Sequence, residues 1–231
     1  MATSTAPFTG FQPAAIEFLI ELAMNNERAW FQPRKAEYER LLREPMESLV
    51  SALLDRFRAR DIPLEADPRR AVFRVYRDTR FSKDKSPYKT NVGASIPWVA
   101  AGGDGPHGLG VYLHFQPGDS FAGGGMYMME RPRLDAFRRL VVEQPDRVLA
   151  AVEEPAFTRT FGGVHGHESL KRVPPGYPAD HPQAELLKMK DVTFGRALDD
   201  DEFLSPDLAD ILADDFATAV PVFRLLASLP G

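Results

Sequence analysis

The middle of the chain contains the pattern that most restricts its fold, a run of alternating apolar and polar residues followed by a turn signal. Apolar side chains occupy every second position from Val111 to Phe115, with polar side chains between them. Pro117-Gly118-Asp119 then predicts a turn, and residues 120–127 the returning strand. Successive strand residues point to opposite faces, so the pattern predicts a sheet with one face in the core.

Three further segments have strand character, residues 71–76, 91–99 and 192–196. Short loops between neighbouring strands favour antiparallel pairing, so we expect an antiparallel sheet of about four to six strands. Helical spacing of apolar residues flanks this region on both sides. The predicted fold class is therefore α+β, with helices from the N- and C-terminal parts packed on the sheet.

The first predicted helix has one apolar face and ends near Asn25-Asn26. Pro45 interrupts the next helical pattern, which predicts either a kink or two consecutive helices. Toward the C-terminus we expect helices from about residues 131 and 145, a loop with room for one short strand over 155–182, and a further helix after Ser205-Pro206-Asp207.

The chain contains no internal repeat and no linker rich in Gly, Ser or Pro. We therefore expect a single domain over residues 1–231, helical over 10–60, strand-rich over 71–128, and helical with loops over 131–231. Cysteine is absent, which excludes disulfides, thiolate metal sites and cysteine nucleophiles, and fits a reducing, cytoplasmic location. We see no secretory signal and no membrane-spanning run.

Formal charge is distributed very unevenly along the chain. The whole protein carries −5, which disfavours a general nucleic-acid coat. Residues 69–89 nevertheless contain eight cationic and two acidic residues, a formal charge of +6, whereas residues 199–215 contain eight acidic residues and no Lys or Arg. These two segments dominate the electrostatics, and the basic one predicts a binding site.

Guanidinium groups bind phosphate or carboxylate through paired hydrogen bonds, and lysine adds a point charge. The basic segment therefore predicts an anion pocket, with phosphate ahead of carboxylate. If the strand continues past Tyr76, Arg77 lies among apolar neighbours; if it stops there, the three arginines can converge. The candidate ligand-binding residues are Arg74, Arg77, Asp78, Arg80, Lys83, Lys85, Tyr88, Lys89 and His114.

Each candidate also has a purely structural interpretation. Arg77 and Arg80 could pair with the acidic residues 199–215 while the lysines are solvated. Tyr88 could anchor the loop through its ring instead of contacting a ligand. His114 could be a general acid or base near neutral pH, or could be held by structural hydrogen bonds.

Several segments of the chain follow a shared pattern. The most specific is Arg74-x-x-Arg77-Asp78-x-Arg80-Phe81-x-x-x-Lys85-x-x-Tyr88. The others are Asn25-Asn26-Glu27-Arg28-x-Trp30-Phe31, Gly123-Gly124-Gly125, Leu170-Lys171-Arg172-x-Pro174-x-Gly176-Tyr177, and His181-Pro182 with Leu186-Leu187-Lys188. Together they resemble the DUF2461 family, found in bacteria and some fungi, with Met129 departing where that family would have proline. The resemblance implies a single domain of this length and brings no activity with it.

No P-loop and no GxGxxG pattern occurs, and the segment His165–Glu168 is better interpreted as a solvated loop than as a metal site. Three hypotheses follow. The protein acts on or binds a phosphorylated small molecule or nucleotide; it is a noncatalytic module for nucleic acid, the less favoured ligand, or for an acidic protein; or the charges form a structural ion-pair network. The sequence defines no cofactor, reaction or oligomeric state.

Overall fold

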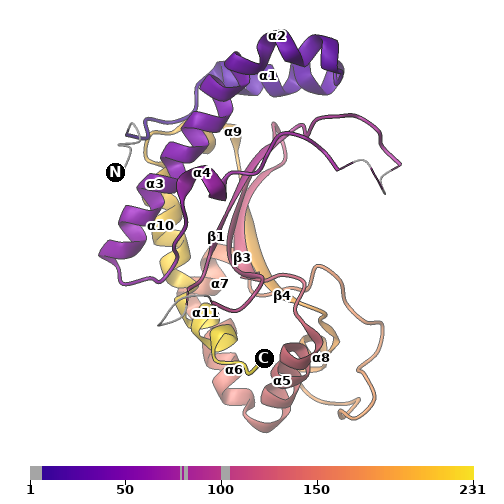
Figure 1. The fold of residues 1–231 in the computed structure, drawn as a ribbon. Coiled ribbons are helices and arrows are strands. Elements are labelled where there is room, and N and C mark those ends of the chain that lie inside the picture. The colour runs from indigo at the N-terminus through magenta and orange to yellow at the C-terminus, as the bar shows by residue number, and fades with distance from the viewer. Residues whose placement is uncertain (1–6, 79, 81–82, 100–104) are drawn as a thin grey trace.

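The computed structural model in Figure 1 describes residues 7–78, 80, 83–99 and 105–231. Its centre is an antiparallel sheet of four strands in the order β1-β2-β3-β4, which confirms the predicted α+β class. The strands are β1 (Val92–Pro97), β2 (Leu109–Phe115), β3 (Ser120–Met126) and β4 (Val192–Leu198). The tight hairpin between β2 and β3 forms where the Pro-Gly-Asp turn predicts it.

The alternation in β2 determines which face of the sheet is buried. Leu113 is buried and pairs with Ala94 on β1 and Ala122 on β3, so these three side chains lie on the core face. Tyr112 and His114 point to the opposite face and are half-buried. The sequence pattern therefore predicted both the strand and its orientation.

The N-terminal part forms a helical layer. It contains α1 (Pro13–Met24), α2 (Arg28–Tyr38), a five-residue π-helical segment η1 (Glu39–Arg43), α3 (Glu44–Ala59) and the single turn α4 (Pro68–Ala71). The apolar face of α1 is buried and the helix ends at Asn25, as expected. Pro45 lies in the first turn of α3, which agrees with the predicted alternative of consecutive helices, and the π-helical segment η1 joins α2 to α3.

The C-terminal part contributes seven helices, which are α5 (Arg131–Glu143), α6 (Pro145–Val152), α7 (Pro155–Phe161), α8 (Ala184–Lys188), α9 (Asp200–Leu204), α10 (Leu208–Thr218) and α11 (Val220–Ala227). The prediction of a loop over 155–182 is wrong at its start, where α7 forms. The Glu154 side chain accepts a hydrogen bond from the Phe157 N–H and caps this helix, and Gly162, in a left-handed conformation, ends it. Short-range capping thus outweighs the abundance of Gly and Pro farther along.

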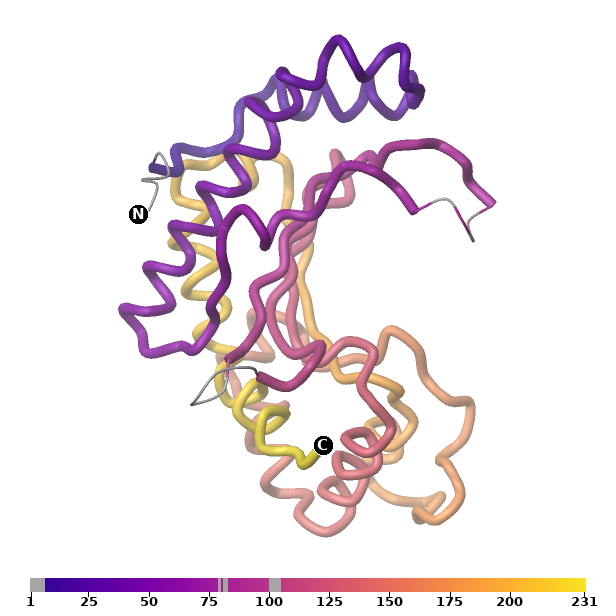
Figure 2. The backbone as a smooth tube through the Cα atoms, in the orientation of Figure 1, coloured from indigo at the N-terminus to yellow at the C-terminus, as the bar shows by residue number. Residues whose placement is uncertain are grey.

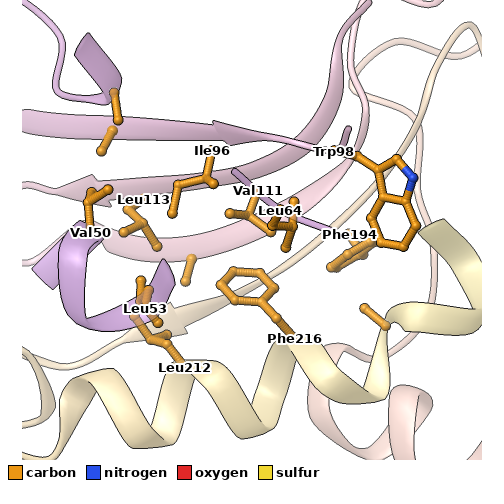
Figure 3. Packing of buried hydrophobic residues seen from close by; sticks show 14 of the residues in the cluster. Val50, Leu53, Leu64, Ile96, Trp98, Val111, Leu113, Phe194, Leu212 and Phe216 are labelled. Atoms are coloured by element: carbon orange, nitrogen blue, oxygen red, sulfur yellow. The ribbon is translucent and has the colours of Figure 1, made fainter. Parts of the chain in front are cut away.

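One face of the sheet is covered by α3, α7, α10 and α11 (Figure 1). Figure 3 shows Leu53 of α3, Leu113 of β2 and Leu212 of α10 meeting between these layers. Buried apolar side chains from the N-terminal helices, the sheet and the C-terminal helices belong to one continuous cluster. The N-terminal helices, the sheet and the C-terminal helices therefore share one core.

The opposite face of the sheet carries several glycines, two of which are required by close backbone contacts. A Cβ atom at Gly123 would lie 2.5 Å from the Phe194 carbonyl oxygen, and one at Gly125 would lie 2.3 Å from that of Val192. Gly125 also has a φ of +112°, which L side chains rarely adopt. The glycines of β3 therefore allow a close backbone approach to β4, one of the two roles that glycine in a strand suggests.

Candidate functional site

The basic candidate residues lie on an irregular two-stranded segment, residues 72–91, which we call the arm; Thr79, Phe81 and Ser82 lie outside the described residues. Figure 2 shows the arm projecting from the end of the sheet beside the N-terminal helices. The predicted strand over 71–76 is wrong, because Ala71 ends α4 and no regular strand follows before β1 in the described part of the chain. Two isolated bridges take its place, Val72 with Ala94 and Tyr76 with Tyr88.

Proline in the arm explains why the pairing stays irregular. The Arg77 N–H donates to the Pro87 carbonyl oxygen at 2.9 Å, but Pro87 has no N–H with which to extend the ladder. Before the arm, the Asp67 side chain accepts a hydrogen bond from the Arg69 N–H and caps α4. Ala71 belongs to this helical turn and is therefore not available to a strand. The strand thus stops near Tyr76, the alternative that lets the three arginines approach one another.

The arm is attached to the N-terminal helices through Tyr88, which is only 1% exposed. The Asn26 side chain accepts from the Tyr88 N–H and donates to the Tyr88 carbonyl oxygen, both at 3.0 Å. The Tyr88 ring stacks on Phe31 at 4.1 Å between centroids, and Gln32 donates to its hydroxyl at 3.3 Å. Tyr88 therefore anchors the arm, and the Asn-Asn-Glu-Arg-x-Trp-Phe segment supplies its contacts through Asn26 and Phe31.

An open cleft of about 490 Å³ lies on the arm. It is lined by Arg74, Tyr76, Arg77, Asp78 and Arg80, so all three arginines reach the same concavity. Tyr76 is the lining residue that sequence reasoning did not single out. It lies two residues from Arg74, and alternate residues of an extended chain share one side, so the sequence contained the signal for its position.

Two of the three arginines are paired with acids of the arm itself. Arg77 donates to Asp84, and Arg80 makes two side-chain hydrogen bonds to Asp78, at 3.0 and 2.7 Å. Hydrogen bonds from the side chain and the backbone N–H of Arg80 lower the pKa of Asp78 to about 2. Hydrogen bonds from Ser86 lower the pKa of Asp84, with a smaller effect from Arg77. Both carboxylates are therefore charged at neutral pH.

Arg74, the third arginine, and Lys89 have no such carboxylate partner among the described residues, where no carboxylate lies within ion-pair distance of either side chain. The Lys89 ammonium lies over the Phe73 ring, 5.2 Å from its centroid. Burial lowers the pKa of Lys89, and the neighbouring guanidinium groups of Arg74 and Arg77 lower it further. Three positive charges of the arm therefore repel one another at close range.

The structural alternative, in which Arg77 and Arg80 pair with residues 199–215, does not hold, because Arg77 pairs with Asp84 and Arg80 with Asp78. The acidic residues bind other arginines: Asp210 pairs with Arg56 at 2.6 Å, Asp214 with Arg60, and Glu202 and Asp215 with Arg196. These partners lie on α3 and β4, next to the C-terminal helices, whereas the arm projects from the sheet end. The acidic segment holds helices together and leaves the arm to its own two carboxylates.

Two lysines of the prediction lie farther out on the arm. Lys83 and Lys85 are both exposed and do not line the cleft. Lys83 follows directly after two residues outside the described range. Both add positive charge to the outer part of the arm.

His114 lies apart from the cleft, on the uncovered face of the sheet. Its Nδ1 is 2.9 Å from the Tyr112 hydroxyl and 3.3 Å from the Asn91 amide nitrogen, and its ring stacks on Phe121. Because an amide NH₂ can only donate, Nδ1 accepts, and the neutral ring carries its proton on Nε2. Burial lowers the pKa of His114, which favours this neutral form. The contact between Phe73 and Tyr112, 6.0 Å between ring centroids, links this cluster to the arm.

The segment His165–Glu168 takes the structural interpretation. Glu168 pairs with Lys190 at 2.7 Å, and the His167 N–H donates to the buried Asp191. No group of three or more His, Asp or Glu side chains within the described ranges could hold a metal ion. A search of the same residues finds no helix with the length and apolar character that crossing a bilayer requires.

Comparison with known proteins agrees with the resemblance seen in the sequence. The profile of the family described as "Conserved hypothetical protein (DUF2461)" matches residues 14–224 of the 231-residue chain. No curated protein and no solved structure matches the chain. The matched region includes the N-terminal helices, the arm, the sheet and nearly all of the C-terminal helices, so the likeness extends well beyond the arginine pattern.

Proposed function

The chain belongs to the DUF2461 family, and we propose that it binds a phosphorylated small molecule in the cleft of the arm. Arg74 and Arg77 hold the phosphate oxygens, and Lys89 contributes a point charge from the side. Asn26 and Tyr88 keep the arm in the conformation that brings these groups together. We propose this binding role for the cytoplasm, in a chain that forms a single domain.

The observation that carries the proposal is the position of Arg74. Its side chain lines the same concavity as Arg77 and has no carboxylate within ion-pair distance among the described residues. An anion in the cleft would give Arg74 a partner and would also relieve its repulsion with Arg77 and Lys89. Binding is therefore favoured twice, because new hydrogen bonds form and the repulsion among Arg74, Arg77 and Lys89 decreases.

The charge of the cleft favours phosphate over carboxylate. The described lining contains three arginines, Arg74, Arg77 and Arg80, and one carboxylate, Asp78, which leave a formal charge of +2. A phosphate monoester carries about −1.5 to −2 at neutral pH and offers three acceptor oxygens. A carboxylate carries a single charge and would neutralise only half of this excess. The proposed ligand is accordingly a dianion.

A polyanion could use the same cations without a defined pocket, since Lys83 and Lys85 extend the positive surface outward. Binding of that kind weakens steeply with salt and depends little on ligand structure. A small phosphorylated ligand held by two guanidinium forks instead depends on ligand shape. The two roles are therefore separated by selectivity among anions at fixed ionic strength.

The test is isothermal titration at low salt with inorganic phosphate, pyrophosphate, sugar phosphates and nucleotides. Hydrogen bonds to charged groups contribute about 1.5–3 kcal/mol each, so Arg74→Gln should weaken binding roughly tenfold to a hundredfold. Arg131→Gln is the matched control, because Arg131 is an exposed arginine on α5, its side chain 92% exposed, and the charge change is the same. Absence of binding by every anion, or equal losses in both variants, would refute the proposal.

A further inference from the structure

The described residues that line the cleft of the arm include one aromatic ring among charged side chains. Tyr76 lines the cleft together with Arg74 and Arg77, and 43% of the residue is exposed. Its ring contacts the buried Tyr88, 5.6 Å between centroids, which supports it from behind. The rest of the exposed ring is available for contact inside a site whose other side chains are all charged.

We infer that the ligand is a nucleoside phosphate whose base stacks on Tyr76 while Arg74 and Arg77 hold its phosphate. This inference rests on the proposed function, because it names the class of phosphorylated ligand. Aromatic side chains bind nucleobases through their flat faces, independently of base sequence. A sugar phosphate has no such face, so the ring would add nothing to its binding.

The ring is placed at the right separation from the cations along the arm. Arg74 and Tyr76 are two residues apart, and Arg77 is the next residue after Tyr76, so the aromatic face and both guanidinium groups border one concavity. Its volume of about 490 Å³ lies within the roughly 300–1,000 Å³ of small-molecule sites. The concavity can therefore accommodate a base and its phosphate together.

A free mononucleotide fits the observations better than a nucleic-acid strand. The whole chain has a formal charge of −5, which repels a polyanion outside the arm. Continuous strand binding uses several aromatic platforms along a basic groove. Among the described residues that line the cleft, Tyr76 is the single aromatic one.

The experiment compares AMP, ribose 5-phosphate, inorganic phosphate, adenosine and a 15-nucleotide oligothymidylate by isothermal titration with the full chain. One stacked base contributes about 1–3 kcal/mol, so AMP should bind roughly fivefold to a hundredfold more tightly than ribose 5-phosphate. Tyr76→Leu should remove this difference, and Tyr76→Phe should preserve it because the ring remains. Tyr127→Leu, at another exposed tyrosine, should have no effect.

The outcomes separate this inference from the proposed function. Equal affinities of the wild-type chain for AMP and ribose 5-phosphate overturn the inference that a base stacks on Tyr76. They leave the proposed phosphate binding standing. Binding of none of the phosphates overturns both. Tight, strongly salt-dependent binding of the oligonucleotide with no measurable binding of AMP overturns the mononucleotide in favour of a strand.

Discussion

Removing the Asn26 side chain should detach the arm from the N-terminal helices. Asn26 makes two hydrogen bonds to the backbone of Tyr88, one in each direction and both at 3.0 Å. Because Tyr88 is 1% exposed, its N–H and carbonyl have little access to water in place of the amide. Asn26→Ala therefore leaves a buried donor and a buried acceptor unpaired.

The magnitude follows from these two bonds. A net hydrogen bond contributes about 0.5–1.5 kcal/mol, and a buried polar group left unpaired costs about 1–3 kcal/mol. Partial rehydration at the edge of the arm reduces the second figure, so we expect Asn26→Ala to lower the free energy of unfolding by about 2–4 kcal/mol. For a chain of this size each kcal/mol lowers Tm by roughly 2–4 °C.

The assay is urea unfolding followed by circular dichroism, with hydrogen exchange at the Tyr88 amide as a local readout. Asn25→Ala is the matched control, since Asn25 makes one exposed hydrogen bond to the Glu21 carbonyl. It should cost about 1 kcal/mol or less and leave the Tyr88 amide protected. A loss below about 0.5 kcal/mol for Asn26→Ala, with unchanged exchange at Tyr88, would refute the anchoring role.

Three further outcomes are expected from the arm and the sheet. The lowered pKa of Lys89 means that its charge is lost as the pH rises through that pKa, so phosphate affinity should fall there in titrations from pH 7 to 10, and Lys89→Gln should remove this dependence. Gly125→Ala should destabilise the protein by about 2–4 kcal/mol in urea unfolding, because it combines a positive φ with a backbone clash. Gly118→Ala, with positive φ but nothing within 4 Å, should cost only about 1–2 kcal/mol. Added sodium chloride should weaken phosphate binding while slowing hydrogen exchange in the unliganded arm, and exchange that is insensitive to salt would contradict the repulsion among its cations.

The central strand β2 was predictable because its residues alternate strictly. Val111 to Phe115 shows one buried and one half-buried face, and the structure has both. The segment 71–76 resembles a strand in composition, yet it lies between a capped helical turn and Pro87, and both restrict its hydrogen bonding. Strand propensity depends on the partner strand, which the local sequence does not contain.

The candidate site was predictable in its charges and not in their pairing. The +6 of residues 69–89 identified the arm, but ion pairs depend on distances between segments far apart in sequence. Asp210 pairs with Arg56, 154 residues away, while Arg77 finds Asp84 only seven residues along the arm. Tyr88 and Tyr76 look alike in the sequence, and only packing against Phe31 makes the first an anchor and leaves the second exposed.

The separation of the two charged segments gives the arm its chemical character. Four of the eight acidic residues in 199–215 pair with arginines: Asp210 with Arg56 on α3, Asp214 with Arg60 directly after α3, and Glu202 and Asp215 with Arg196 on β4. The first two pairs have exposed carboxylates and contribute only about 0–1 kcal/mol each, so they matter chiefly because they occupy those carboxylates. Within the arm, Asp84 pairs with Arg77 and Asp78 with Arg80, and no carboxylate of the described residues lies within ion-pair distance of Arg74. A bound dianion would therefore form with Arg74 the kind of ion pair that Asp210 forms with Arg56, but it would do so reversibly.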